Sequence, residues 1–290
     1  MKTIYFSLIT VLFIVFSCTK EIPFKGDIGN GFIVVNGIIE SDSIIKISLS
    51  KSKAAIGEQN TGPSEITTSA NLILTDKTTG ETFTSNTVNS NGKYEFGTKV
   101  KTGHSYSISI THPSYSTATS ETSIPDAVKI KDWDTSSIKN EFNGIEKNLV
   151  LTIDDPSTEN LYILKVFAVD SLQMEESLYL TPNENNQVFE DGGGISYLFD
   201  DSGFNGQSKK IVVKFNPAKY MDAMYYDYTE EKSYKIVLYN VSREVYNYIL
   251  STSKAVNSDG IFSEPVKVYT NITNGLGVFG GMNSSTVFIK

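Results

Sequence analysis

From residue 32 onward, the chain consists of short runs in which apolar and polar residues alternate, separated by turn-forming residues. In residues 44–50 apolar side chains occupy every second position, and residues 105–110 repeat this pattern. A period of two predicts strands with one buried face. Similar runs predict strands at 32–39, 72–74, 82–84 and 93–96, with a turn at 89–92 where Asn-Gly supplies positive φ at low cost.

The second half of the chain also reads as β structure, with one exception. Strands are expected at 149–153, 162–169, 210–215 and 233–239. A helix is expected over residues 242–256, with Ser242 as N-cap and Glu244 in the first turn. Its apolar stripe consists of Val245, Tyr246, Ile249, Leu250 and Val256.

These elements predict a mainly β protein built of two parts. About seven short strands at 8–12-residue spacing before residue 125 are typical of a sandwich of immunoglobulin or prealbumin type. Ile124-Pro125-Asp126-Ala127 is interpreted as a hinge. We therefore expect a β-sandwich domain at 31–125 and a β-rich domain with one packed helix at 126–290.

The N-terminus has the features of an export signal. The apolar stretch 4–16 is shorter than the about 20 residues that span a bilayer, and it has the length of a signal-peptide core. Ser17-Cys18 follows, contains the single cysteine of the chain, and resembles a bacterial lipobox. That resemblance implies a signal peptide at 1–17, cleavage after Ser17, and a diacylglycerol thioether on Cys18. The alternative is a conventional secretory signal with a buried cysteine nearby.

Residues 18–30 are short, polar and contain Pro and Gly, so they are expected to be the tether of a lipidated protein. Lys20-Glu21 resembles the charged surface-export signal of Bacteroidota lipoproteins. Several acyl chains, at about 0.8 kcal/mol per buried CH₂, would hold the protein on a membrane almost irreversibly. We expect an outer-membrane protein that faces the cell exterior.

The amino-acid composition and net charge argue against several kinds of binding partner and metal site. The 290 residues are 39% hydrophobic and 11% aromatic, as in a folded globular protein. A formal net charge of −8 argues against a nucleic-acid partner, which would require a basic face. One cysteine excludes an intramolecular disulfide framework and a cysteine-rich zinc site, and two histidines leave little for histidine metal chemistry.

Most sequence motifs that could support catalysis are absent or lack the structural context that they require. Residues 275–280 match GxGxxG, but a dinucleotide-binding turn must open a helix inside a βαβ unit, and only ten residues follow. We interpret them as a glycine-rich bend before the last strand. No GxSxG motif occurs, and His104 and His112 are expected at strand ends or turns. The sequence therefore predicts a protein that is not an enzyme, with no catalytic residues, no metal and no cofactor except the lipid.

Three groups of residues remain as candidate sites. The acidic pairs Glu190-Asp191 and Asp200-Asp201 could bind calcium or act as acid and base, or they are solvated loop residues. A tyrosine cluster could form a ligand or partner surface, or a packed strand edge; its members are Tyr220, Tyr225, Tyr226 and Tyr228. Ser43 and Ser171 lie in Asp-Ser-apolar triplets that resemble the O-glycosylation motif of Bacteroidota, and Ser43 is the better candidate.

Several segments, taken in order, resemble one family over nearly the whole chain. They are the lipobox with Lys20-Glu21, then residues 34–39, 47–52, 200–207, 242–250, 263–266 and 270–280. This pattern resembles the Bacteroidota lipoproteins grouped as domain of unknown function 4249. The resemblance implies an outer-membrane lipoprotein often encoded beside TonB-dependent receptors, and it carries over no catalytic residues.

We therefore expect a surface-facing, non-catalytic accessory lipoprotein of a nutrient-uptake complex. Its partners would be the outer membrane, a TonB-dependent receptor and an unidentified small ligand such as a peptide, a glycan or a metal chelate. One alternative is a free-standing cell-surface interaction or adhesion module. Another is a hydrolase that uses the acidic pairs.

Overall fold

The computed structural model of the chain describes residues 31–52, 64–139, 145–170, 172–182, 194–216, 218–222, 225–230, 233–256 and 266–289. Cys18, Ser17, Lys20, Glu21, Ser171, Glu190 and Asp191 lie outside these residues. Within them, no helix is long and apolar enough to cross a membrane.

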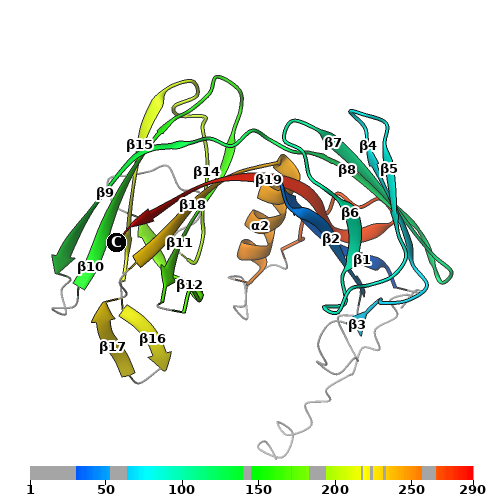
Figure 1. Cartoon of the computed structure of the whole chain (residues 1–290), viewed down its shortest axis with the longest axis horizontal. Coiled ribbons are helices and arrows are strands. Elements are labelled where there is room, and N and C mark those ends of the chain that lie inside the picture. Colours follow the sequence, from blue (N-terminus) through cyan, green and yellow to red (C-terminus); the bar gives the residue numbers. More distant parts are fainter. Residues whose placement is uncertain are drawn as a thin grey trace, which may run out of the picture. The chain divides into compact units, whose positions relative to one another are not determined.

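The N-terminal part is a sandwich of two sheets (Figure 1). One sheet has the order β5 (Thr82–Ser85), β4 (Asn71–Asp76), β7 (Ser105–His112), β8 (Tyr115–Ser123). The facing strands are β1 (Ile33–Glu40), β2 (Ile44–Lys51), β3 (Ser64–Glu65) and β6 (Tyr94–Lys99), together with the start of β19 (Gly275–Ile289). Alternate residues of these strands form one buried cluster, for example Ile45, Ile47 and Leu49 of β2. The strands predicted from the period-two pattern are therefore confirmed here.

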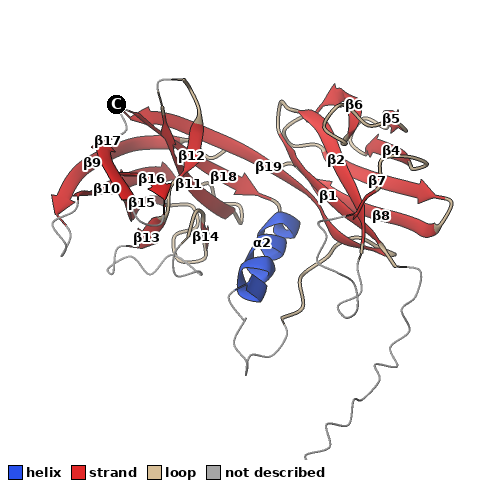
Figure 2. Ribbon diagram, turned by 90° about the horizontal axis from the view of Figure 1, so that it is seen from below, coloured by secondary structure: helices blue, strands red, loops and turns tan. Residues whose placement is uncertain are grey.

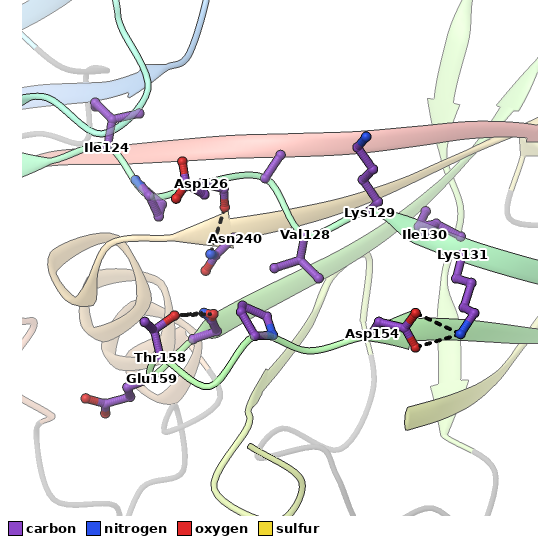
Figure 3. Close-up of a pocket in the computed structure, with 14 residues that line it drawn as sticks. Ile124, Asp126, Val128, Lys129, Ile130, Lys131, Asp154, Thr158, Glu159 and Asn240 are labelled. Atoms are coloured by element: carbon purple, nitrogen blue, oxygen red, sulfur yellow. Dashed lines mark hydrogen bonds and ion pairs between the residues drawn. The ribbon is translucent and has the colours of Figure 1, made fainter. Parts of the chain in front are cut away.

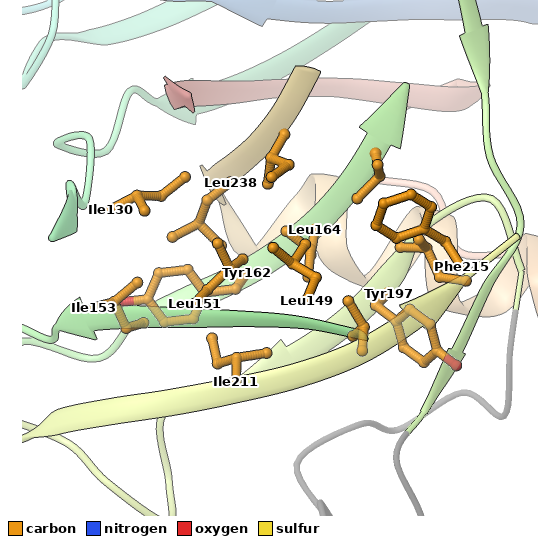
Figure 4. Close-up of a cluster of buried hydrophobic side chains, with 14 of the residues drawn as sticks. Ile130, Leu149, Leu151, Ile153, Tyr162, Leu164, Tyr197, Ile211, Phe215 and Leu238 are labelled. Atoms are coloured by element: carbon orange, nitrogen blue, oxygen red, sulfur yellow. The ribbon is translucent and has the colours of Figure 1, made fainter. Parts of the chain in front are cut away.

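The C-terminal part is a second sandwich. Its outer sheet has the order β13 (Leu180–Pro182), β15 (Ser208–Phe215), β10 (Ile145–Asp154), β9 (Ile130–Lys139). The facing strands are β12 (Glu175–Ser177), β11 (Leu161–Val169), β14 (Tyr197–Asp200), β18 (Ser233–Val241) and the end of β19. Leu149, Tyr162 and Leu238 are among the side chains that fill the space between the layers (Figure 4). A separate hairpin consists of β16 (Ala218–Asp222) and β17 (Tyr225–Glu230).

Strand β19 belongs to both parts. Its first half pairs in parallel with β1, from Ile33–Gly275 to Glu40–Met282, and its second half pairs antiparallel with β18. Residues 31–290 form one compact unit with two main hydrophobic cores. The division at residue 125 stays a prediction, whereas the mainly β sandwich architecture is confirmed.

The helix α2 (Arg243–Val256) packs where β18 and β19 pass between the two parts (Figure 2). Val245 and Tyr246 are buried against β11, β14 and β18, with Ile249 and Leu250 at the margin. The predicted helix is confirmed, but Val256 is 72% exposed and lies outside the packed stripe. The Ser242 carbonyl accepts the first helical bond from Tyr246, as expected of an N-cap position.

The prediction of a glycine-rich bend at residues 275–280 is wrong, because these residues belong to strand β19. Its glycines permit close approach of other backbones. A Cβ at Gly277, where φ is +94°, would lie 2.1 Å from the Val35 carbonyl oxygen, and one at Gly281 would lie 2.3 Å from that of Ser123. The glycines are therefore required by strand packing, and no βαβ unit surrounds them.

Candidate functional site

A pocket of about 850 Å³ lies beside the connection between β8 and β9 (Figure 3). One wall is this connection, which runs from Ile124 to Lys129 without regular secondary structure. The opposite wall is the last residue of β10, Asp154, and the β10–β11 connection as far as Asn160, and Asn240 of β18 lies between the two walls. The pocket therefore occupies the segment that the sequence predicted to be a hinge.

Side chains of β18 and β19 hold the first wall in place. Asn240 Nδ2 donates to the Asp126 carbonyl at 2.9 Å, and Asn283 Nδ2 donates to the Pro125 carbonyl at 3.1 Å. The Ile130 amide donates to Ser285 Oγ at 3.1 Å. Because amide and hydroxyl side chains replace the missing ladder partners, a segment without secondary structure keeps a defined path.

The middle of this wall has unpaired backbone. In the part of the chain that the structure describes, the backbone N–H and C=O groups of Ala127, Val128 and Lys129 have no hydrogen-bond partner. Val128 is only 5% exposed, because its side chain enters the C-terminal core. Unpaired main-chain groups therefore line the pocket beside a side chain that fixes the segment.

Charges surround the pocket in nearly balanced numbers. Lys131 Nζ lies 2.8 Å from Asp154 Oδ2, and this hydrogen bond lowers the pKa of the Asp154 carboxyl. Glu159 pairs with Arg243 of α2. Asp126 and Lys129 also line the pocket, and no ion-pair partner for either lies among the described residues. The apolar lining comes from Ile124, Pro125, Ala127, Val128, Ile130 and Pro156, and no aromatic side chain contributes.

A buried network of carboxylates supports the second wall. Asp155 accepts hydrogen bonds from the Tyr162 hydroxyl and, at 2.9 Å, from the Gly206 amide. Asp201 Oδ2 accepts from the Asn160 amide at 2.7 Å. Burial, and then the neighbouring carboxylates of Asp155 and Asp200, raise the pKa of Asp201. These groups hold the residues that flank the pocket.

The predicted acidic site takes a different form in the structure. Asp201 is 2% exposed and not a solvated loop residue, because the turn after β14 folds inward onto Phe204. Asp200 is half-buried and accepts two hydrogen bonds from Ser202, at 3.0 Å from its amide and 2.6 Å from its hydroxyl. Among the described residues, no group of three or more His, Cys, Asp or Glu side chains could hold a metal ion.

The other predicted site residues lie apart from the pocket. Tyr220, Tyr225, Tyr226 and Tyr228 fall in the β16–β17 hairpin, where Tyr220 is the cross-strand partner of Tyr226. Ser43 lies exposed in the turn between β1 and β2, a position accessible to modification. Sequence reasoning did not identify the pocket residues; its one signal was the Ile-Pro-Asp hinge.

The two histidines lie at strand ends, as predicted, but they differ in their surroundings. His112 accepts from the Ser114 amide in the turn after β7. His104 Nδ1 lies 2.8 Å from Oδ2 of Asp76, which is 1% exposed. Burial opposes ionisation of Asp76, but hydrogen bonds from His104 and from the Thr78 and Thr79 amides together hold its pKa below the ordinary value.

We expect His104→Ala to destabilise the protein by about 1–3 kcal/mol, because a buried carboxylate loses a hydrogen-bond partner. Because the pKa of Asp76 is lower in the folded than in the unfolded protein, its ionised form stabilises the fold at pH values above the unfolded pKa of 3.8. This stabilisation is lost as the pH falls through the folded pKa. Without His104 the folded pKa rises, so acid unfolding should begin at higher pH. Circular dichroism during acid titration measures this shift; an unchanged midpoint, or an equal shift in His112→Ala, would contradict it.

Three comparisons place the chain among known proteins. A family model described as "Domain of unknown function (DUF4249)" matches residues 19–287. No curated protein matches. A solved structure titled "Biofilm associated protein - BSP domain" is 11% identical to the chain. The aligned region covers 90% of this chain and 59% of that structure. The TM-score is 0.21, too low to show a shared fold.

Proposed function

The chain belongs to the DUF4249 family, whose description states no activity, and from this premise we propose that it is a non-catalytic binding lipoprotein. In this proposal, lipid on Cys18 holds it on the outer membrane, facing outward, as an accessory component of a TonB-dependent uptake complex. The observation that carries the proposal is a formed pocket on a chain with a lipid-attachment motif.

The extent of the family match supports the lipid anchor. The match begins at residue 19, directly after Cys18, so the preceding apolar segment lies outside the family domain. This is the division expected when a leader is removed at Ser17 and the new N-terminus is Cys18. The tether 18–30 then leads directly to β1.

The pocket lining suits binding and not group transfer. It offers apolar side chains, amides, two paired charges on the second wall and unpaired backbone on the first. A site of about 300–1,000 Å³ with a few polar groups among apolar ones is typical of small-molecule binding.

The anchor is tested by Cys18→Ala in the full-length chain. We expect the variant to move from the membrane fraction to the soluble fraction almost completely, because no acyl chains remain to insert. Ser43→Ala, in an exposed turn, serves as the matched control and should stay with the membrane. Retention of Cys18→Ala on detergent-free membranes would show that the anchor is not lipid on this cysteine.

The partner is tested by purifying the tagged protein from outer membranes in mild detergent and identifying co-eluting proteins by mass spectrometry. A TonB-dependent receptor in near-stoichiometric amount would support the uptake role. Recovery of the lipoprotein alone would contradict it and favour a free-standing interaction or adhesion module.

A further inference from the structure

The unpaired backbone at Ala127–Lys129 is the unusual feature of the pocket. More than about 90% of buried backbone N–H and C=O groups in folded proteins are paired. Here three consecutive residues in a pocket wall have no partner among the described residues; Val128 is buried, whereas Ala127 and Lys129 are exposed to the pocket side and to solvent. These groups are available to a ligand that carries complementary donors and acceptors at the same spacing.

The segment is already held in position for such pairing. Hydrogen bonds from Asn240 and Asn283 fix its start, and the bond from the Ile130 amide to Ser285 fixes its end. It then continues into β9, which pairs with β10 on one side and forms the edge of its sheet. Little conformational entropy would be lost on binding, because the wall keeps its path without a ligand.

The lining distinguishes among ligand classes. No aromatic side chain is present on which a sugar ring could stack, and no cluster of three potential metal ligands exists in the described part of the chain. A peptide, in contrast, carries backbone N–H and C=O groups, and alternate residues of an extended peptide present them to one edge. Main-chain pairing with an exposed edge is an established mode of peptide recognition.

The charges set the length and polarity of the ligand. Asp126 precedes the unpaired residues, Lys129 is the last of them, and neither side chain has an ion-pair partner among the described residues. Three residues of extended chain span roughly 10 Å at about 3.3 Å per residue. The ammonium and carboxylate ends of a short peptide have this separation, and each would meet a charge of opposite sign.

We infer that this pocket binds a short peptide, which pairs its main chain with the exposed residues Ala127 and Lys129 and places its charged ends beside Asp126 and Lys129. The inference rests on the proposed binding role and names the class of ligand. Pairing supplies affinity for any sequence, whereas the apolar lining selects among side chains.

The direct test is amide hydrogen exchange of the purified full chain, with a tryptic digest of casein as the probe. We expect peptides to be retained on ultrafiltration and to slow exchange at residues 127–129 at least tenfold. Maltoheptaose and ferric citrate are the comparison probes. Retention of either of these without the peptides, or peptide retention without protection at 127–129, would overturn the inference.

Ala127→Pro tests the main-chain contact, because proline removes a donor at an exposed side-chain position. We expect at least a tenfold loss of peptide retention, whereas the matched control Ala127→Ser, which keeps the N–H, should bind as the unchanged chain does. Equal retention by both variants would contradict the contact. If Ala127→Pro does not fold, the exchange measurement on the unchanged chain decides.

The outcomes also separate this inference from the proposed function. A co-purifying receptor without peptide retention would overturn the peptide assignment and leave the accessory role intact. Peptide retention without a receptor would support the assignment and contradict the uptake complex.

Discussion

Gly277→Ala is expected to destabilise the protein by about 2–5 kcal/mol, enough at the upper end to prevent folding of a marginally stable chain. A non-glycine residue with left-handed φ costs roughly 1–2 kcal/mol, and overpacking adds about 1–3 kcal/mol. The added Cβ would lie 2.1 Å from the Val35 carbonyl oxygen, a backbone atom that cannot move aside. Relief requires β1 to separate from β19, which opens the sheet shared by both sandwiches.

The matched control is Gly97→Ala, the same substitution in strand β6, where a Cβ would meet nothing within 4 Å. Its midpoint in urea should be close to that of the unchanged protein. Equal midpoints for the two variants, measured by circular dichroism, would show that close packing at Gly277 does not limit stability.

Asp155→Ala should cost about 2–3 kcal/mol, because the buried Tyr162 hydroxyl loses its charged acceptor and the exposed Gly206 amide loses its partner. The Tyr162 hydroxyl lies in the C-terminal core, and the Gly206 amide belongs to the turn that precedes β15. The Tyr162 hydroxyl would remain buried without a partner, whereas the exposed Gly206 amide would turn to solvent. We expect a lower urea midpoint and faster amide exchange at Gly206.

Asp201→Asn supplies the contrast within the same network. Because the pKa of Asp201 is higher in the folded than in the unfolded protein, its protonated form stabilises the fold at pH values below the unfolded pKa of 3.8. This stabilisation is lost as the pH rises through the folded pKa. Asparagine resembles the protonated carboxyl and still accepts from the Asn160 amide. Its midpoint at pH 7 should therefore equal or exceed that of the unchanged chain; a loss as large as in Asp155→Ala would contradict this account.

The hydrogen bonds of Asp155 and Asp201 stabilise the fold and also hold one wall of the pocket. Asp155 lies between the lining residues Asp154 and Pro156, and Asp201 binds the amide of the lining residue Asn160. Of the acidic pairs that the sequence offered as candidate sites, Asp201 therefore positions a pocket wall, together with Asp155, which the sequence did not single out. Paired acids alone could not show this, since exposed and buried carboxylates look alike in a sequence.

Strands with apolar alternation were predictable because each one buries its own apolar face. Strand β8 was not predicted, since its buried positions include Ser120 and Thr122 in place of apolar residues. Ser120 donates to the Asn271 carbonyl, and Thr122 Oγ1 accepts from the Gly281 amide, both about 150 residues away. Burial of these hydroxyls depends on partners that no local pattern contains.

The sequence by itself determined the β class, most strand positions, the helix and the candidate lipid site, because these depend on local periodicity and short motifs. Only the tertiary structure decided that β19 joins both sandwiches, that its glycines serve packing, and that the hinge lines a pocket. Those features arise from contacts between residues far apart in the chain. Unpaired backbone at Ala127–Lys129 becomes visible only when every neighbour of that segment is known.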